Sequence, residues 1–158
     1  MALGAAALVT GCGASKFIHY DGPEITRVVV RKSTRQMYLI NEQTALRVLP
    51  VQLGFKSKGH KQFSGDGRTP EGRYHVDRRN PNSAFYLSVG IDYPNDRDRA
   101  FAAALNRDPG GDIFIHGWGD QKRNPSKDWT AGCVAVTNEE MREVYAMVRN
   151  GTPVDIYA

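Results

Sequence analysis

Short β-branched runs separated by turn residues are the feature that most limits the fold of this chain. Such runs cover residues 25–30, 36–40 and 45–53. β-branched residues pack well on a pleated surface, and several short runs divided by turns are typical of antiparallel strands. Because Pro50 cannot donate to a strand ladder, we expect the third run at a sheet edge or a bulge. The early chain is therefore predicted to be a β-meander.

Further strands and two loops are expected downstream. The strands are predicted at residues 74–77, 84–89, 113–115 and 154–157. Residues 54–72 are rich in Gly, Lys, His, Ser and Asp, which indicates a loop. A second loop is predicted from Gly117 to Asp128, directly after a strand that delivers His116 at its end.

Two helices are predicted among these strands. Asn95 is a suitable cap for a short helix over residues 96–106, whose second half is rich in alanine. The clearer signal covers residues 138–149, where Thr137 and Glu140 form a capping box. Apolar residues recur there at helical spacing, which predicts a buried stripe made of Met141, Val144, Tyr145 and Val148.

The length of 158 residues suits one sizeable core and is too short for two. We expect a leader with a short tether over residues 1–24 and one domain over residues 25–157. The first ten residues are small and mostly apolar, and Val9, Thr10 and Gly11 precede Cys12. This pattern resembles a bacterial lipobox, although no Lys or Arg precedes Cys12. It implies lipidation of Cys12 and export to the cell envelope, with a membrane anchor facing the periplasm or the outer surface.

The formal net charge of +4 comes from positive residues scattered along the chain. Scattered charge attracts any anionic polymer weakly, and no dense basic run or nucleic-acid motif is present. We therefore expect no nucleic-acid partner, and we expect a monomer.

Cys133 and His116 are the candidate chemical groups. If Cys12 carries a lipid, Cys133 has no disulfide partner, and a lone thiol in an exported protein calls for reactivity or deep burial. An imidazole within reach can convert the thiol into a thiolate nucleophile. Gly132 allows the tight backbone turn that would aim N–H groups at a reacting carbonyl. From these residues alone catalysis and structural burial both stay open, whereas one His and one Cys supply too few ligands for a metal.

Three ordered motifs resemble the L,D-transpeptidase (YkuD-type) catalytic-domain family. The resemblance covers residues 25–157 and implies a mostly β, β-sandwich-like fold with a helix in the C-terminal region. The matching residues are Gly65-Asp66-Gly67-Arg68-Thr69-Pro70-Glu71-Gly72-Arg73-Tyr74, Ile115-His116-Gly117, and Thr130-Ala131-Gly132-Cys133, followed by Asn138 and Gly151-Thr152-Pro153-Val154.

The resemblance implies that Cys133 is the nucleophile and that His116 is the base, oriented by a backbone carbonyl. It further implies oxyanion N–H groups from Gly132 and Cys133, and a Thr130 hydroxyl that holds the loop beside the substrate. The implied substrates are peptidoglycan stem peptides, which form a Cys133 thioester and then a 3→3 cross-link, without a metal or an organic cofactor.

Several residues around these motifs leave alternatives open. Trp118 and Trp129 flank the loop and could line a substrate groove or simply pack within it. His60 could line the site or be a solvated loop residue. Ala131 and Ala135 stand where the family often has His or Ser and Arg or Asn, which leaves the acyl acceptor open. The same fold could therefore act as an L,D-carboxypeptidase or amidase, or as a non-catalytic peptidoglycan-binding module.

Overall fold

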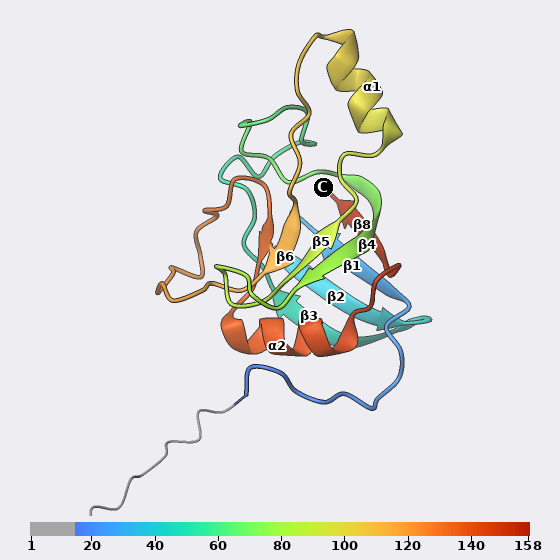
Figure 1. The fold of residues 1–158 in the computed structure, drawn as a ribbon, viewed down its shortest axis with the longest axis vertical. Coiled ribbons are helices and arrows are strands. Elements are labelled where there is room, and N and C mark those ends of the chain that lie inside the picture. The colour runs from blue at the N-terminus through green and yellow to red at the C-terminus, as the bar shows by residue number, and fades with distance from the viewer. Residues whose placement is uncertain (1–14) are drawn as a thin grey trace, which may run out of the picture.

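The computed structural model describes residues 15–158, which form eight strands and two helices (Figure 1). The meander at the start of the domain contains three of the strands. In chain order the elements are β1 (Arg27–Arg31), β2 (Gln36–Asn41), β3 (Thr44–Pro50), β4 (Gly72–Asn80), β5 (Ser88–Ile91), α1 (Asp96–Ala104), β6 (Phe114–His116), β7 (Val134–Ala135), α2 (Asn138–Met147) and β8 (Pro153–Tyr157).

The strands form one curled sheet in the order β3-β2-β1-β8-β4-β5-β6-β7. β1 pairs in parallel with β8, β6 pairs in parallel with β7, and the other neighbours are antiparallel. The segment after β3 reaches the far end of the sheet, where Gln52 bridges to Ala135 and Gly54 bridges to Thr130. The two ends of the sheet therefore meet, and the mostly β fold predicted from the sequence is confirmed.

A single apolar core fills the curled sheet. It joins residues from both halves, such as Val30 of β1, Leu39 of β2 and Ile115 of β6. The middle strands β1 and β8 each bury three consecutive residues, as expected for strands covered on both faces. α2 adds Met141 and Val144 to the same core, so the predicted apolar stripe faces inward.

Both predicted helices are present, and both begin at their predicted caps. The side chain of Asn95 accepts from the backbone N–H groups of Arg97 and Asp98 at the start of α1. Thr137 and Glu140 form the reciprocal capping box of α2. Each helix ends two residues before its predicted end, at Ala104 and Met147.

One strand prediction is corrected by the structure, and one strand was missed. The run at residues 84–89 forms a strand only from Ser88, because Tyr86 has a left-handed φ of 74° that extended backbone does not tolerate. The two-residue strand β7 was not predicted. β3 does lie at an end of the sheet order and ends at Pro50, as that proline suggested.

The predicted lipidation site, Cys12, lies outside the described residues. Within residues 15–158, neither helix combines the length and the apolar character that crossing a bilayer requires.

Candidate active site

His116 and Cys133 belong to neighbouring strand segments, β6 and the turn into β7. His116 is the last residue of β6, as predicted, and Cys133 directly precedes β7. In the parallel β6–β7 pair His116 lies opposite Ala135, two residues after Cys133. Cys133 is therefore level with Phe114 at the start of β6, two residues along the strand from His116.

The Cys133 thiol is held among backbone groups. Its Sγ accepts from the N–H of Phe114 at 3.4 Å and donates to the carbonyl of Asp112 at 3.5 Å. Burial raises the pKa of the Cys133 thiol, and the Phe114 hydrogen bond and the positive charge of Lys61 offset this only in part. The resting group is therefore a thiol, so the thiolate expected from the sequence has to form during a reaction.

His116 is buried, with 3% of its surface exposed, and its ring is held by the backbone of the next residue. Nδ1 lies 2.7 Å from the carbonyl oxygen of Gly117. Because a carbonyl only accepts, Nδ1 carries the hydrogen and Nε2 keeps its lone pair. Burial lowers the pKa of His116, the Gly117 bond opposes this, and the positive charge of Arg123 lowers the pKa further. The ring is thus a neutral imidazole that can accept a proton.

Aromatic side chains surround the imidazole. The ring of Phe85 stacks on His116 with centroids 4.5 Å apart, and Trp129 meets His116 edge-on at 5.6 Å. Trp129 is fixed by a 2.9 Å hydrogen bond from Nε1 to Gln52, and the guanidinium of Arg123 lies 3.9 Å above its ring. Trp129 is therefore beside the site, as the sequence suggested. Phe85 was missed because it is distant in sequence and belongs to no motif.

The turn before Cys133 requires glycine. Gly132 has a φ of 145°, and a Cβ there would lie 2.6 Å from the carbonyl oxygen of Arg68. The Gly132 N–H donates to Thr130 Oγ1 at 3.2 Å, and this hydroxyl donates to the carbonyl of Cys133 at 2.7 Å. Thr130 is buried, so its hydroxyl holds the turn and is not displayed to a substrate.

The first residue of α2 fixes the loop that follows His116. Asn138 Oδ1 accepts from the N–H groups of Trp118 and Gly119 at 2.9 and 3.1 Å, and Nδ2 donates to the carbonyl of Gly119 at 2.8 Å. A Cβ on Gly117 would lie 2.6 Å from Asn138 Oδ1. Asn138 therefore packs against the residue whose carbonyl orients the imidazole.

Trp118, unlike Trp129, is not among the aromatic side chains that contact His116 within residues 15–158. It lines two hollows at the start of α2, with Thr137 common to both. Its Nε1 is buried and has no hydrogen-bond partner within the described part of the chain. No aromatic contact to His116 is recorded for Trp118 among residues 15–158, so the two tryptophans do not form one wall there.

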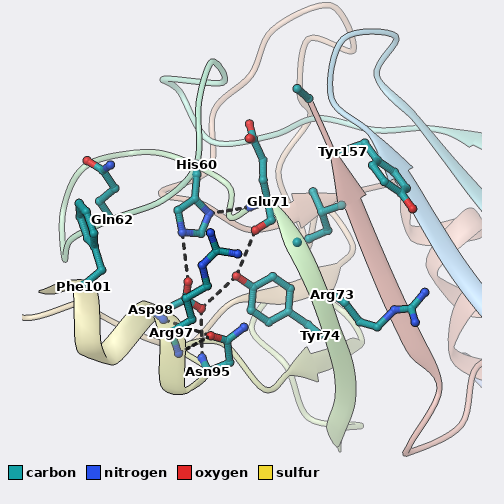
Figure 2. Close-up of a pocket in the computed structure, with 13 residues that line it drawn as sticks. His60, Gln62, Glu71, Arg73, Tyr74, Asn95, Arg97, Asp98, Phe101 and Tyr157 are labelled. Atoms are coloured by element: carbon teal, nitrogen blue, oxygen red, sulfur yellow. Dashed lines mark hydrogen bonds and ion pairs between the residues drawn. The ribbon is translucent and has the colours of Figure 1, made fainter.

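His60 belongs to a separate pocket of 580 Å³, shown in Figure 2, which neither Cys133 nor His116 lines. Its Nε2 lies 3.1 Å from Asp98 Oδ1, and its Nδ1 accepts from the N–H of Glu71 at 2.9 Å. Tyr74 donates to the other oxygen of Asp98 at 3.0 Å. His60 therefore ties the 54–72 loop to α1, and the structure does not bring it to the other candidate residues.

Two further observations concern ligands. Ala135 is fully buried, and its backbone exchanges hydrogen bonds of 2.8 and 2.9 Å with Gln52, so no side-chain charge comes from this position. Within residues 15–158, no three His, Cys, Asp or Glu side chains converge as metal ligands would.

Three comparisons relate the chain to known proteins. Residues 25–156 match the family model of the YkuD L,D-transpeptidase catalytic domain. YafK of Escherichia coli (strain K12) is 34% identical over 92 residues, which cover 57% of this chain and 32% of YafK. The helical cell shape determining protein Pgp2 of Campylobacter jejuni, as its K307A mutant, superposes with a TM-score of 0.64 at 25% identity, covering 87% of this chain and 48% of that chain.

A more distant structure shows the fold alone. L,D-transpeptidase 1 of Mycobacterium tuberculosis superposes with a TM-score of 0.52 at 15% identity, over 85% of this chain and 62% of that one. The chain spans about a third of YafK and about half of the Pgp2 chain. Since the family match starts before β1 and ends within β8, at residue 156, the chain belongs to the L,D-transpeptidase (YkuD) catalytic-domain family.

Proposed function

We propose that this chain transfers acyl groups between peptidoglycan stem peptides, with Cys133 as nucleophile and His116 as base. One observation carries the proposal: a buried, neutral imidazole oriented by the Gly117 carbonyl ends the strand next to the one that Cys133 precedes. A cysteine nucleophile needs such a base nearby. Family membership supplies the substrate class.

The reaction has two acyl-transfer steps. Cys133 Sγ attacks the amide carbonyl on the carboxyl side of the third stem residue while His116 Nε2 takes the thiol proton. The imidazolium then protonates the leaving amine, the terminal D-amino acid departs, and a thioester remains. The amine of a second stem attacks the thioester, gives a proton to His116, and leaves a 3→3 cross-link, while the proton returns to Sγ. Splitting one difficult transfer into two lowers each barrier.

The oxyanion of each tetrahedral intermediate needs N–H donors. The Gly132 N–H is already bonded to Thr130 Oγ1, so we assign the oxyanion to the N–H of Cys133. Gly132 contributes its backbone conformation to this arrangement, because φ is 145° and Arg68 leaves no room for a Cβ.

Arg123 is the proposed partner of a stem carboxylate. Its positive charge lowers the pKa of His116, and its guanidinium lies 3.9 Å from the centre of the Trp129 ring. Its Nε is buried without a hydrogen-bond partner within the described residues. A guanidinium binds a carboxylate through two parallel hydrogen bonds. Arg123 would supply the cation that buried Ala135 cannot, with Trp129 and Phe85 as the apolar wall.

For the whole protein we propose export as a monomeric envelope lipoprotein anchored through Cys12. The lipobox-like residues before Cys12 support this assignment. Mass analysis of the N-terminal peptide from the native host tests it, since an unmodified Cys12 would remove the anchor.

Product analysis with purified stem tetrapeptides tests the proposed reaction. We expect release of the terminal D-amino acid and, when a second stem is present, a cross-linked dimer. The Cys133→Ala variant should give neither product. Tripeptide without any dimer would assign a carboxypeptidase. Binding of peptidoglycan without product would assign a non-catalytic module and contradict the proposal.

A further inference from the structure

A hollow unrelated to the candidate active site lies between α2 and the segment that leads into β1. Figure 1 shows this segment, which we call the tether (residues 15–24), running alongside α2. The hollow has a volume of 370 Å³ and shares no residue with the site around His116. Its lining residues are Phe17, Ile18, His19, Tyr20, Arg79, Arg142, Tyr145, Ala146 and Arg149.

Three arginines and no carboxylate line this hollow. Arg79 donates to the backbone carbonyls of Tyr145 and Val148, and Arg142 donates to the carbonyl of Ser15 at 2.9 Å. Carbonyl oxygens satisfy N–H donors but carry no net charge, so the positive charges stay uncompensated. Arg149 is exposed, and its side chain has no recorded partner within residues 15–158.

Acidic residues elsewhere do not neutralise the hollow. Glu143 of α2 is paired with Arg47 at 2.6 Å and is not part of the lining. Asp21, one residue beyond the lining, is exposed on the tether. Residues 1–14 contain no Asp and no Glu, so their side chains cannot supply a carboxylate either.

One donor of a lining arginine also lacks an acceptor. Arg142 Nε is buried and has no hydrogen-bond partner in the part of the chain that the structure describes. A buried donor without an acceptor is costly, and an anion that accepts from it would recover that cost. The charge and this free donor both favour an anionic ligand with several acceptor oxygens, such as a phosphate group.

Exposed apolar side chains flank the same arginines. Phe17 is 50% exposed and Ile18 is 39% exposed, and both lie on the tether next to Lys16. The ring of Phe17 reaches Tyr145 with centroids 6.1 Å apart, so these side chains sit at the rim of the hollow. Aromatic and aliphatic side chains beside a cluster of cations are typical of surfaces that lie on anionic membranes.

We propose that this hollow binds the phosphate headgroup of an anionic phospholipid, with Phe17 and Ile18 at the boundary of the acyl chains. A soluble phosphate would use the arginines but would have no use for the exposed apolar rim. The tether and the outer side of α2 would then lie on the membrane surface. This proposal does not depend on the chemistry at Cys133 or on lipidation of Cys12.

Vesicle co-sedimentation of the full chain tests the proposal, with Cys12→Ser as background so that no acyl chain contributes. We expect vesicles containing phosphatidylglycerol to bind at least about tenfold more tightly than phosphatidylcholine vesicles, because each cation near an anionic surface adds to binding. Arg149→Glu should weaken binding to the anionic vesicles about tenfold. Arg97→Glu is the matched control, because Arg97 is an exposed arginine on α1 outside this hollow. It should change binding less than about twofold.

Three results would overturn the proposal. Equal binding to both vesicle types would mean that apolar partition alone holds the protein. Equal losses of vesicle binding in Arg149→Glu and Arg97→Glu would mean that binding depends only on the net charge of the protein. Binding of inorganic phosphate that depends on Arg149, measured by calorimetry, without binding to phosphatidylglycerol vesicles would assign a soluble ligand. An unchanged thermal midpoint in both variants ensures that folding does not cause the difference.

Discussion

Burial acts on both proposed catalytic side chains by disfavouring their charged forms. It raises the pKa of Cys133 and lowers the pKa of His116, so the resting protein holds Cys133 as a thiol and His116 as a neutral imidazole. An ion pair formed in advance would be costly in this environment. In the proposed mechanism the thiolate instead forms as the thiol attacks, when His116 takes its proton.

The pH dependence of the proposed reaction follows from the raised pKa of Cys133 and the lowered pKa of His116. We expect kcat/KM to be level across neutrality and to fall below pH 6.5, because burial lowers the pKa of His116 and protonation of His116 removes the base. Alkylation of Cys133 by iodoacetamide should be slower at pH 7 than alkylation of free cysteine. Its rate should still be increasing above pH 9.0, because burial raises the pKa of the thiol. Alkylation faster than free cysteine at pH 7 would contradict a resting thiol.

Individual residues also show where sequence reasoning reaches its limit. His116, Cys133 and Gly132 could be selected because they lie in short motifs of restricted chemistry. His60 and Phe85 could not be placed, because their neighbours come from distant segments. His60 meets Asp98 of α1, whereas Phe85 stacks on His116. Such contacts depend on how the sheet curls, and no local sequence pattern predicts that curvature.

At the scale of elements, the turn into β7 and the start of α2 position the site. The turn holds Cys133 through Thr130 and Gly132, and α2 holds the loop after His116 through Asn138. Asn95 as a cap and the capping box of Thr137 and Glu140 made both helix starts predictable. The strand β7 has only two residues and takes its identity from pairing with β6, so the sequence carries no periodic signal for it.

The turn gives a stability prediction. Gly132→Ala forces a side chain into a φ of 145° and against the Arg68 carbonyl, so we expect a loss of about 3 kcal/mol in the free energy of unfolding. The thermal midpoint should fall by roughly 10 °C. Gly111→Ala is the control, because nothing lies within 4 Å of a Cβ there. A midpoint equal to that of the control would refute the turn assignment.

The contact between α2 and the loop gives an activity prediction. Asn138→Ala frees the loop that carries the Gly117 carbonyl, and we expect kcat/KM to fall about tenfold to a hundredfold through misplacement of His116. Because that carbonyl raises the pKa of His116, its displacement should also shift the acidic limb of the pH profile to lower pH. Exposed Glu139, the next residue, is the control, and Glu139→Ala should retain activity within about twofold. A loss of activity without a pH shift would argue against a positioning role.

At the scale of the whole molecule, the curled sheet accounts for the site. Its two ends meet where Gln52 bridges to Ala135 of β7 and Gly54 bridges to Thr130 in the turn before β7. This closure places Arg68 of the 54–72 loop against Gly132. The mostly β class followed from the β-branched runs and their turns. Neither the strand order nor the closure could be predicted from composition or periodicity, because both depend on pairings between distant segments such as β1 with β8.

Intact-protein mass spectrometry after mixing with a purified stem tetrapeptide tests the central claim most directly. The chain should gain the mass of the tripeptide acyl group on Cys133 while one terminal D-amino acid is released. His116→Gln should slow this acylation about a hundredfold or more, because the proton acceptor is lost. Cys133→Ala should show no adduct. An adduct that persists in Cys133→Ala, or no adduct on the folded native chain, would contradict the account.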